Sequence, residues 1–177
     1  MDRNKKNLHF IKKAKKIKML LLDVDGVLTD GKIYLDDEGR ETKAFDIHDG
    51  HGITLLHRAG ILVGIISGRS SRSVEIRAKQ LSIQEVYQGV VDKIKAYEEI
   101  LKRYNLKDEA VAYIGDDLVD LPLLRRVGLS VGVANAHEAV KKDVDWVTKK
   151  EGGGGAVREV VDHLLRSQGK WPELVET

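Results

Sequence analysis

The chain has 177 residues, of which 42% are hydrophobic and 33% are charged, so we expect a soluble globular domain and not a disordered or fibrous protein. It has no cysteine, which excludes a disulfide framework, a zinc–thiolate site and a cysteine nucleophile. No apolar run approaches the ~20 residues of a membrane span, and the basic start lacks the apolar core of a secretory signal. We therefore expect a cytoplasmic enzyme or binding domain that does not insert into a membrane.

The net charge of +2 conceals an uneven distribution. Residues 1–18 form a basic leader with a net charge of +7, and the remainder of the chain carries −5. Such a leader either binds nucleic acid or anionic lipid, or forms a helix that docks onto the body through its apolar side. We favour the docked helix and expect no nucleic-acid partner, because no aromatic stacking platform accompanies the basic residues. The apolar side would consist of Leu8, Phe10, Ile11 and Ala14.

The body of the chain alternates between patterns typical of strands and of helices. Short apolar runs predict buried parallel strands at 19–22, 61–66, 86–87, 110–114 and 129–133, with an edge strand at 146–147. Apolar residues at helical spacing predict helices at 52–59, 71–80, 93–104 and 156–165, with shorter helical segments after residue 117 and at 136–140. Residues 31–46 predict a β-hairpin, because Ile33–Leu35 and Thr42–Phe45 flank a turn rich in Asp and Gly.

This alternation predicts an α/β fold with a Rossmann-like, doubly wound and mostly parallel sheet that has helices on both faces. Only about 20 residues separate the first Asp-rich motif from the next helix, which is too few for a large cap domain. We therefore expect one capless domain over residues 19–168, with the hairpin as a short insertion. The glycine run 152–155 and the C-terminal tail 169–177 are candidates for a mobile lid, although a disordered tail fits equally well.

Polar residues follow four of the predicted strands, at the edge where open α/β sheets bind ligands. They are Asp23 and Asp25 after the first strand, Ser67 after the second, Lys93 near the third, and Asp116 and Asp117 after the fourth. Carboxylates that gather without His or Cys favour Mg²⁺, which relieves their repulsion and prefers oxygen ligands. Mg²⁺ and Lys93 together would form a receptor for a phosphate dianion.

The Asp-x-Asp spacing after the first strand permits a division of labour in phosphoryl transfer. Asp23 can act as the nucleophile and form an aspartyl phosphate, and Asp25 can protonate the leaving alcohol and then activate water. The Ser67 hydroxyl and the backbone N–H groups of the Ser67-Gly68-Arg69 turn can bind the phosphoryl oxygens. Each signal alone also fits turn or cap chemistry, and we expect Asp120 to be a local turn or helix residue and not a metal ligand.

The order of these motifs resembles the haloacid dehalogenase-like phosphohydrolase superfamily. The resemblance is carried by Asp23–Thr29, Ile66–Arg69, Lys93 and Gly115–Asp120, and it covers nearly the whole body of the chain. It implies that Asp23 is the nucleophile and Asp25 the acid/base. It also implies that Mg²⁺ is held by the Asp23 carboxylate, the Asp25 main-chain carbonyl and Asp116, with Asp117 orienting a metal-bound water.

Segments outside these motifs resemble the family of 3-deoxy-D-manno-octulosonate 8-phosphate (KDO 8-phosphate) phosphatases. These segments are Lys43–Asp46, Asp49–Gly52, Gly152–Val157 and Ser167–Lys170. The resemblance implies hydrolysis of KDO 8-phosphate to KDO and phosphate, in lipopolysaccharide precursor synthesis. It further implies a homotetramer in which the hairpins meet and a neighbour helps to close each active site. Arg69 and Arg77 would hold the anionic groups of the substrate, and His51 would lie near the substrate mouth.

Three alternatives stay open at this point. The motifs define the chemistry and not the length of the sugar, so a nine-carbon sugar-acid phosphate is a second candidate substrate. A receiver-like signalling module also combines an acidic pocket, a Ser or Thr and a Lys, but it has no role for the second Asp of Asp-x-Asp. A catalytically inactive interaction domain would not need every catalytic residue. We assign no metal site to His48, His51 and His57, since they do not follow a predicted strand.

Overall fold

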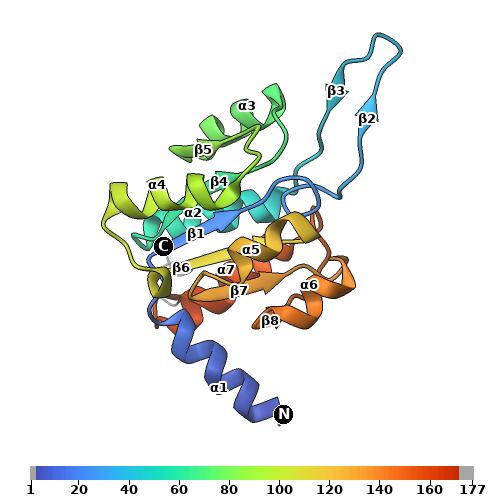
Figure 1. Ribbon diagram of the computed structural model, residues 1–177. Coiled ribbons are helices and arrows are strands. Elements are labelled where there is room, and N and C mark those ends of the chain that lie inside the picture. The colour runs from blue at the N-terminus through green and yellow to red at the C-terminus, as the bar shows by residue number, and fades with distance from the viewer. Residues whose placement is uncertain (1–2, 172–177) are drawn as a thin grey trace.

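The computed structural model describes residues 3–171, with side chains from residue 8 onward. Its centre is a six-stranded parallel sheet in the order β5-β4-β1-β6-β7-β8 (Figure 1). The strands are β1 (Met19–Leu22), β4 (Leu62–Ile66), β5 (Glu85–Tyr87), β6 (Val111–Gly115), β7 (Leu129–Gly132) and β8 (Trp146–Val147). This order confirms the predicted doubly wound fold. It also places the switch point, where such sheets bind ligands, between β1 and β6.

Helices cover both faces of the sheet, as predicted (Figure 1). On one face α2 packs against β4 and α7, and α1 packs against α7; on the other face α4 packs against β4, and α5 packs against β6. The helices are α1 (Arg3–Ala14), α2 (Ile47–Arg58), α3 (Arg72–Gln80), α4 (Lys93–Tyr104), α5 (Leu121–Leu124), α6 (Glu138–Asp143) and α7 (Ala156–Ser167), with short 3₁₀ turns η1 (Asp108–Ala110) and η2 (Leu118–Asp120). None of the helices within residues 3–171 is long and apolar enough to span a lipid bilayer.

Capping sets the start of α2, which differs from the prediction. The helix begins at Ile47, whereas apolar periodicity alone predicts a start at Gly52. The side chain of Asp46 accepts hydrogen bonds from the backbone N–H groups of His48 at 2.6 Å and Asp49 at 3.1 Å. These bonds satisfy two of the free N–H groups of the first turn, so the helix extends back to this residue.

The predicted hairpin is present, but its paired strands are shorter than expected. β2 (Tyr34–Leu35) and β3 (Glu41–Thr42) form an antiparallel pair with two residues on each side. They project away from the body of the molecule (Figure 1), and their side chains are mostly exposed. Burial therefore adds little to the pairing, and Ile33 and residues 43–45 stay outside the strands.

The basic leader docks as the helix α1. Phe10 and Ala14 are buried, and the Phe10 ring meets the Trp146 ring edge-on at a centroid distance of 5.0 Å. The predicted contact of Leu8 was wrong, because this side chain lies on the outer side of the helix and is 67% exposed. The Lys13 ammonium donates to the Asp145 carboxylate at 2.6 Å, which attaches the leader to the loop before β8. Part of the positive charge of the leader therefore has a structural partner.

The glycine run 152–155 packs directly against the turn that follows β1. A Cβ at Gly152 would lie 1.7 Å from the carbonyl oxygen of Gly26, and one at Gly153 would lie 2.5 Å from the backbone nitrogen of Asp30. The backbone N–H of Gly153 also donates to the carbonyl of Val27 at 2.9 Å. Gly152 and Gly153 therefore pack against the body of the protein, where only residues without a side chain permit so close a contact. That the run 152–155 forms a mobile lid stays a prediction. The tail beyond Trp171 lies outside the described residues.

The pairing of α2 with α7 depends on a capping contact between the two helices. The N-cap residue of α7 is Gly155, which has no side chain to accept a hydrogen bond. Asp49 of α2 replaces it, because its Oδ1 atom accepts a hydrogen bond from the backbone N–H of Arg158 at 2.7 Å. The other oxygen, Oδ2, is buried without a hydrogen-bond partner. Burial raises the pKa of Asp49 to about 6.

We expect Asp49→Asn to change how stability depends on pH. The folded protein holds the Asp49 proton more tightly than the unfolded chain, whose Asp pKa is about 3.9, so this group lowers stability as the pH rises from about 4 to about 6. Asn keeps an oxygen acceptor without the charge and avoids this loss. The melting temperature of the variant relative to the wild type should therefore be higher at pH 7 than at pH 4. Thermal melts measure this, with Asp162→Asn as the control for a new amide, and a difference independent of pH contradicts it.

Candidate active site

The turn after β1 places the first carboxylate of the site. Asp23 follows the strand directly, and the next residues turn sharply around the hydroxyl of Thr29, which accepts a hydrogen bond from the backbone N–H of Gly26 at 3.3 Å. Gly26 has a φ of +96°, which L side chains rarely adopt. A Cβ at Gly26 would lie 2.0 Å from Asp116 Oδ2. Glycine is therefore required here for the carboxylate after β6 to approach the turn after β1.

Lys93 connects the carboxylates of two separate elements. Its ammonium donates to Asp23 Oδ1 and to Asp120 Oδ1, both at 2.7 Å, and lies 3.0 Å from the Tyr113 hydroxyl. The Lys93 side chain is only 6% exposed, although it belongs to the first turn of α4, where the helix dipole disfavours a cation. The two carboxylates compensate for this unfavourable place, and the lysine in turn reduces their mutual repulsion.

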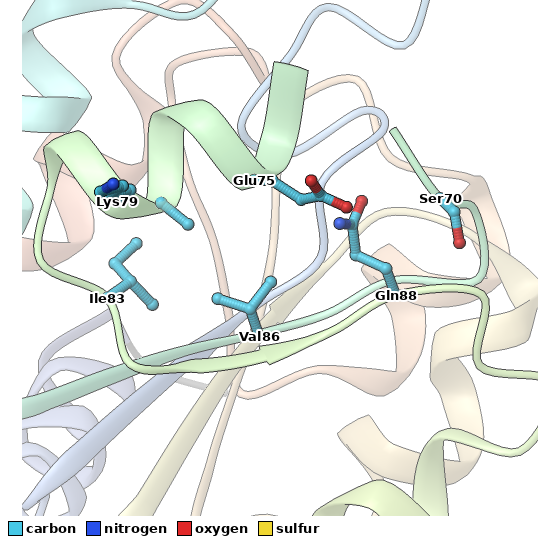
Figure 2. A pocket seen from close by; sticks show the side chains of 7 residues that line it. Ser70, Glu75, Lys79, Ile83, Val86 and Gln88 are labelled. Atoms are coloured by element: carbon cyan, nitrogen blue, oxygen red, sulfur yellow. The ribbon is translucent and has the colours of Figure 1, made fainter. Parts of the chain in front are cut away.

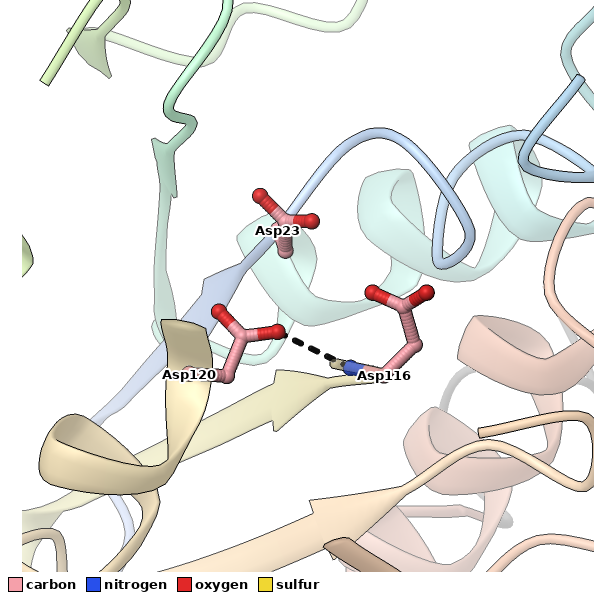
Figure 3. Close-up of side chains that lie close together, drawn as sticks. All are labelled: Asp23, Asp116 and Asp120. Atoms are coloured by element: carbon pink, nitrogen blue, oxygen red, sulfur yellow. Dashed lines mark hydrogen bonds between the residues drawn. The ribbon is translucent and has the colours of Figure 1, made fainter. Parts of the chain in front are cut away.

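Asp120 organises the loop after β6 (Figure 3). Its Oδ2 atom accepts hydrogen bonds from the backbone N–H groups of Asp116 at 3.0 Å and Asp117 at 3.2 Å. Its Oδ1 atom accepts from Lys93 and, at 2.5 Å, from Tyr113. Both oxygens are thus engaged in hydrogen bonds to neighbouring groups, and that Asp120 does not bind a metal stays a prediction. Its link to Lys93 was missed, because the sequence carries no signal for it.

Burial and crowding change the protonation of the centre. Burial raises the pKa of Asp116 to about 8, and the charges of Asp23 and Asp120 add to this effect. The pKa of Asp23 is raised to about 6, because burial outweighs the favourable Lys93 ammonium. Burial alone lowers the pKa of Lys93, but the carboxylates of Asp23 and Asp120 raise it above its ordinary value. One lysine therefore faces three carboxylates, and the centre lacks positive charge.

The residues present fit a divalent cation. Oxygen atoms of Asp23, Asp116 and Asp120 lie within 4.8 Å of one another (Figure 3). Asp120 has no acceptor capacity left, whereas the Asp116 carboxylate has no Lys or Arg partner among the described residues. An all-oxygen set of ligands is what Mg²⁺ prefers, and its charge would lower the repulsion that raises these pKa values. Asp23 and Asp116 are the carboxylates that would hold it.

The second motif contributes a buried hydroxyl. Ser67 follows β4 and is only 2% exposed, and its Oγ atom accepts a hydrogen bond from the backbone N–H of Arg69 at 3.3 Å. Its own backbone is fixed by the next strand, because its N–H donates to the Tyr87 carbonyl at 2.9 Å and its carbonyl accepts from Val90 at 3.1 Å. Ser67 and the turn with Gly68 thus have the rigidity that a phosphate-binding group needs.

A second group of charges surrounds Asp25 at the base of the hairpin. The ammonium of Lys43 pairs with Asp25 Oδ1 and, at 2.8 Å, with Glu41 Oε1. Glu41 Oε2 in turn accepts a hydrogen bond from Arg69 at 2.6 Å. Sequence reasoning did not find Lys43 or Glu41 as members of the site. Lys43 begins one of the segments that carry the family resemblance, but neither that resemblance nor strand periodicity indicated what its side chain contacts.

Two predicted substrate-binding residues lie beside α2. Arg77 is hydrogen-bonded to Gln80 at 3.3 Å and lies so close to Gly50 that a Cβ there would be 2.3 Å from its guanidinium. His51 is exposed, and its Nδ1 atom lies 3.4 Å from Arg158. Within residues 3–171 the contacts of Arg77 and His51 are separate from those of the carboxylate centre. Their roles, and the role of Asp117 beside a metal, stay predictions.

Two hollows of the described surface lie away from the carboxylate centre. One, of about 600 Å³, lies between α3 and β5 and is lined by Ser70, Glu75, Ala78, Lys79, Ile83, Val86 and Gln88 (Figure 2). The other, of about 680 Å³, lies near the amino ends of β1 and β4 and includes Lys15, Lys16, Lys18 and Lys170. We place the reaction at the carboxylates, because they and Lys93 supply the chemistry that both hollows lack.

Comparisons with known proteins agree with this centre. Residues 75–160 match the family model of haloacid dehalogenase-like hydrolases. The chain is 48% identical over 165 residues to the 3-deoxy-D-manno-octulosonate 8-phosphate phosphatase KdsC of Salmonella typhi, with 93% of this chain and 88% of that protein covered.

Solved structures extend the likeness to three dimensions. The 3-deoxy-D-manno-octulosonate 8-phosphate phosphatase of Yersinia pestis is 47% identical, with a TM-score of 0.91 and coverage of 93% of this chain and 89% of that chain. The phosphatase of the same name from Moraxella catarrhalis, in complex with a magnesium ion, a phosphate ion and KDO, is 41% identical, with a TM-score of 0.93 and coverage of 99% and 98%. The chain therefore belongs to the KDO 8-phosphate phosphatase family of haloacid dehalogenase-like hydrolases.

Proposed function

We propose that this protein is a magnesium-dependent phosphomonoesterase that hydrolyses KDO 8-phosphate to KDO and inorganic phosphate. The observation that carries the proposal is the carboxylate centre at the β1–β6 switch point, where Lys93 bridges Asp23 and Asp120 and leaves Asp116 uncompensated. The KDO, phosphate and magnesium in the Moraxella catarrhalis relative support this substrate. Release of KDO would serve lipopolysaccharide precursor synthesis.

In the first half of the reaction, a carboxylate oxygen of Asp23 forms a bond to phosphorus while the bond from phosphorus to the sugar oxygen breaks. Asp25 gives its proton to the departing oxygen, so KDO leaves with a neutral hydroxyl group at this position and not as an alkoxide. Lys93 holds Asp23 in place for attack, and Ser67 with the turn of Gly68 binds the phosphoryl oxygens. The product of this half is an aspartyl phosphate on Asp23.

In the second half, Asp25 takes a proton from a water molecule as the water oxygen forms a bond to phosphorus. The bond between phosphorus and Asp23 breaks, which releases inorganic phosphate and restores the carboxylate. Magnesium, when bound by Asp23, Asp116 and the main-chain carbonyl of Asp25, neutralises the charge that accumulates on the phosphoryl oxygens. Asp117 would orient the water that completes the coordination of the metal.

We expect Asp23→Asn to lower phosphate release from KDO 8-phosphate by roughly 10³-fold or more, because an amide is not a nucleophile of comparable strength. EDTA should abolish the activity of the wild type, and added Mg²⁺ should restore it. Asp37→Asn, a change of the same type on the exposed hairpin, is the matched control and should leave turnover unchanged.

The same assay separates the other candidate functions. A nine-carbon sugar-acid phosphate that is hydrolysed with a higher kcat/KM than KDO 8-phosphate would change the assigned substrate but not the chemistry. A stable phosphoprotein after a single turnover would indicate a receiver-like module. The absence of any phosphate chemistry in the folded protein with Mg²⁺ would indicate an interaction domain.

We further propose that the enzyme works in the cytoplasm as a homotetramer. A charged sugar phosphate does not cross a lipid bilayer unaided, since an unpaired charge is costly in hydrocarbon, so the enzyme belongs where its substrate is made. The hairpin exposes Ile33 by 54%, Tyr34 by 44% and Leu35 by 64%, and side chains of this kind favour contact with another protein surface. In the tetramer the hairpins would meet, and a neighbour would help to close each site.

We expect Ile33→Lys with Leu35→Lys to dissociate the tetramer, because two charges would replace exposed apolar side chains at and before β2 of the hairpin. Sedimentation velocity would then detect smaller species, and kcat/KM for the sugar phosphate should fall as the neighbour is lost. Ile76→Lys is the control, since Ile76 on α3 is 50% exposed but does not belong to the hairpin. A tetramer that survives the double change would exclude the hairpin as the contact.

The tail beyond Trp171 is proposed to cover an active site, in the same or a neighbouring subunit. A chain that ends after Trp171 keeps the packing of this ring on Arg166, at 4.2 Å from the guanidinium carbon. We expect this truncation to raise KM for KDO 8-phosphate and to weaken inhibition by the product, because the site becomes more open. Steady-state kinetics measure both, and unchanged values for turnover and inhibition would contradict a lid.

A further inference from the structure

We propose that Lys43 is a positioning residue that fixes the acid/base Asp25, so that Asp25 Oδ2 is the oxygen that exchanges the proton. This inference rests on the proposed phosphatase function. Lys43 comes from the base of the hairpin, outside the four strand-end segments that supply Asp23, Ser67, Lys93 and Asp116. Its side chain is only 2% exposed, and its ammonium pairs with Asp25 Oδ1 and with Glu41 Oε1.

The contacts around Asp25 distinguish its two oxygens. Lys43 occupies Oδ1, and Glu41 holds Lys43 from the other side at 2.8 Å. The cation recorded nearest to Oδ2 is Arg69, whose Nε atom is 3.9 Å away and thus beyond hydrogen-bond distance. Arg69 is itself held by Glu41 at 2.6 Å. Of the two oxygens, Oδ2 is therefore the one available to a leaving group or a water.

Attachment of the hairpin does not account for a buried ammonium at this place. Removal of charged groups from water is costly, and a well-packed apolar side chain often stabilises a protein as well or better. The strands β2 and β3 pair over only two residues each, so the hairpin has few contacts with which to offset that cost. A role in positioning the acid/base Asp25 explains why Lys43 is buried, whereas a purely structural role does not.

The proposal has a chemical consequence that depends on the leaving group. A sugar alkoxide is a strong base and must be protonated as its bond to phosphorus breaks, whereas nitrophenolate leaves readily without a proton. A misplaced Asp25 therefore slows the transfer of phosphate from a sugar but affects the transfer from p-nitrophenyl phosphate much less. The ratio kcat/KM covers the steps up to phosphorylation of Asp23, so it measures this difference directly.

The test is Lys43→Met, assayed with KDO 8-phosphate and with p-nitrophenyl phosphate in saturating Mg²⁺. We expect kcat/KM to fall by about 10²-fold or more for the sugar phosphate and by less than about tenfold for the aryl phosphate. Lys43→Arg keeps the cation and should recover part of the loss with the sugar phosphate. Lys142→Met is the control, because Lys142 is exposed on α6, outside the hairpin and the carboxylate centre, and both activities should be unchanged.

Circular dichroism and sedimentation verify that the Lys43→Met variant keeps its fold and its assembly. If it does not fold, Lys43→Gln takes its place, because it removes the ammonium beside Asp25, keeps a polar side chain at this position and leaves the pair of Glu41 and Arg69 in place, and it should cause the same bias between the two substrates. An equal loss with both substrates, or no loss, would overturn the positioning role. A wild type that hydrolyses the aryl phosphate but not the sugar phosphate would instead contradict the proposed substrate.

Discussion

Repulsion among carboxylates is the constraint on which the active centre depends. Asp23 and Asp116 must come close, because β1 and β6 are neighbours at the switch point of the sheet. Lys93 compensates Asp23 and Asp120, but burial, together with the neighbouring carboxylates, still raises the pKa of Asp116 to about 8. The same arrangement thus favours the binding of a cation beside Asp116 and, through Lys93, holds the nucleophile Asp23 in place. If every carboxylate of the centre were paired with a Lys or Arg of the protein, the centre would have no site for a metal ion or a phosphate.

Backbone contacts fix the shape of this centre more than side chains do. The turn after β1 is enclosed between the Asp116 loop and the glycine run 152–155, at distances that a Cβ at Gly26 or Gly152 would prevent. The run continues into α7, whose first turn is capped by Asp49 from α2. The glycine run therefore supports the turn that follows the nucleophile.

The hairpin brings charged side chains to the side of the centre where Asp25 lies, although it forms few contacts of its own. Its base returns two charged residues, Glu41 and Lys43, to the surroundings of Asp25 and Arg69. The opposite strand, with the preceding Ile33, keeps apolar side chains in solvent. An insertion with two-residue strands gains few contacts of its own, so its position is determined by the charges at its base and by whatever meets these apolar side chains.

Local patterns in the chain were sufficient for the strands, for α4 and for the convergence of Asp23, Lys93 and Asp116, because the ends of neighbouring parallel strands must meet at one edge. These local patterns did not predict which charged side chains pair with one another. Lys43 meets Asp25 across 18 positions of sequence, and Glu41 meets Arg69 across 28. Periodicity indicates which side of an element is buried, but distances between remote side chains exist only after the chain has folded. Tertiary structure alone therefore decided how the charges around the catalytic carboxylates are shared.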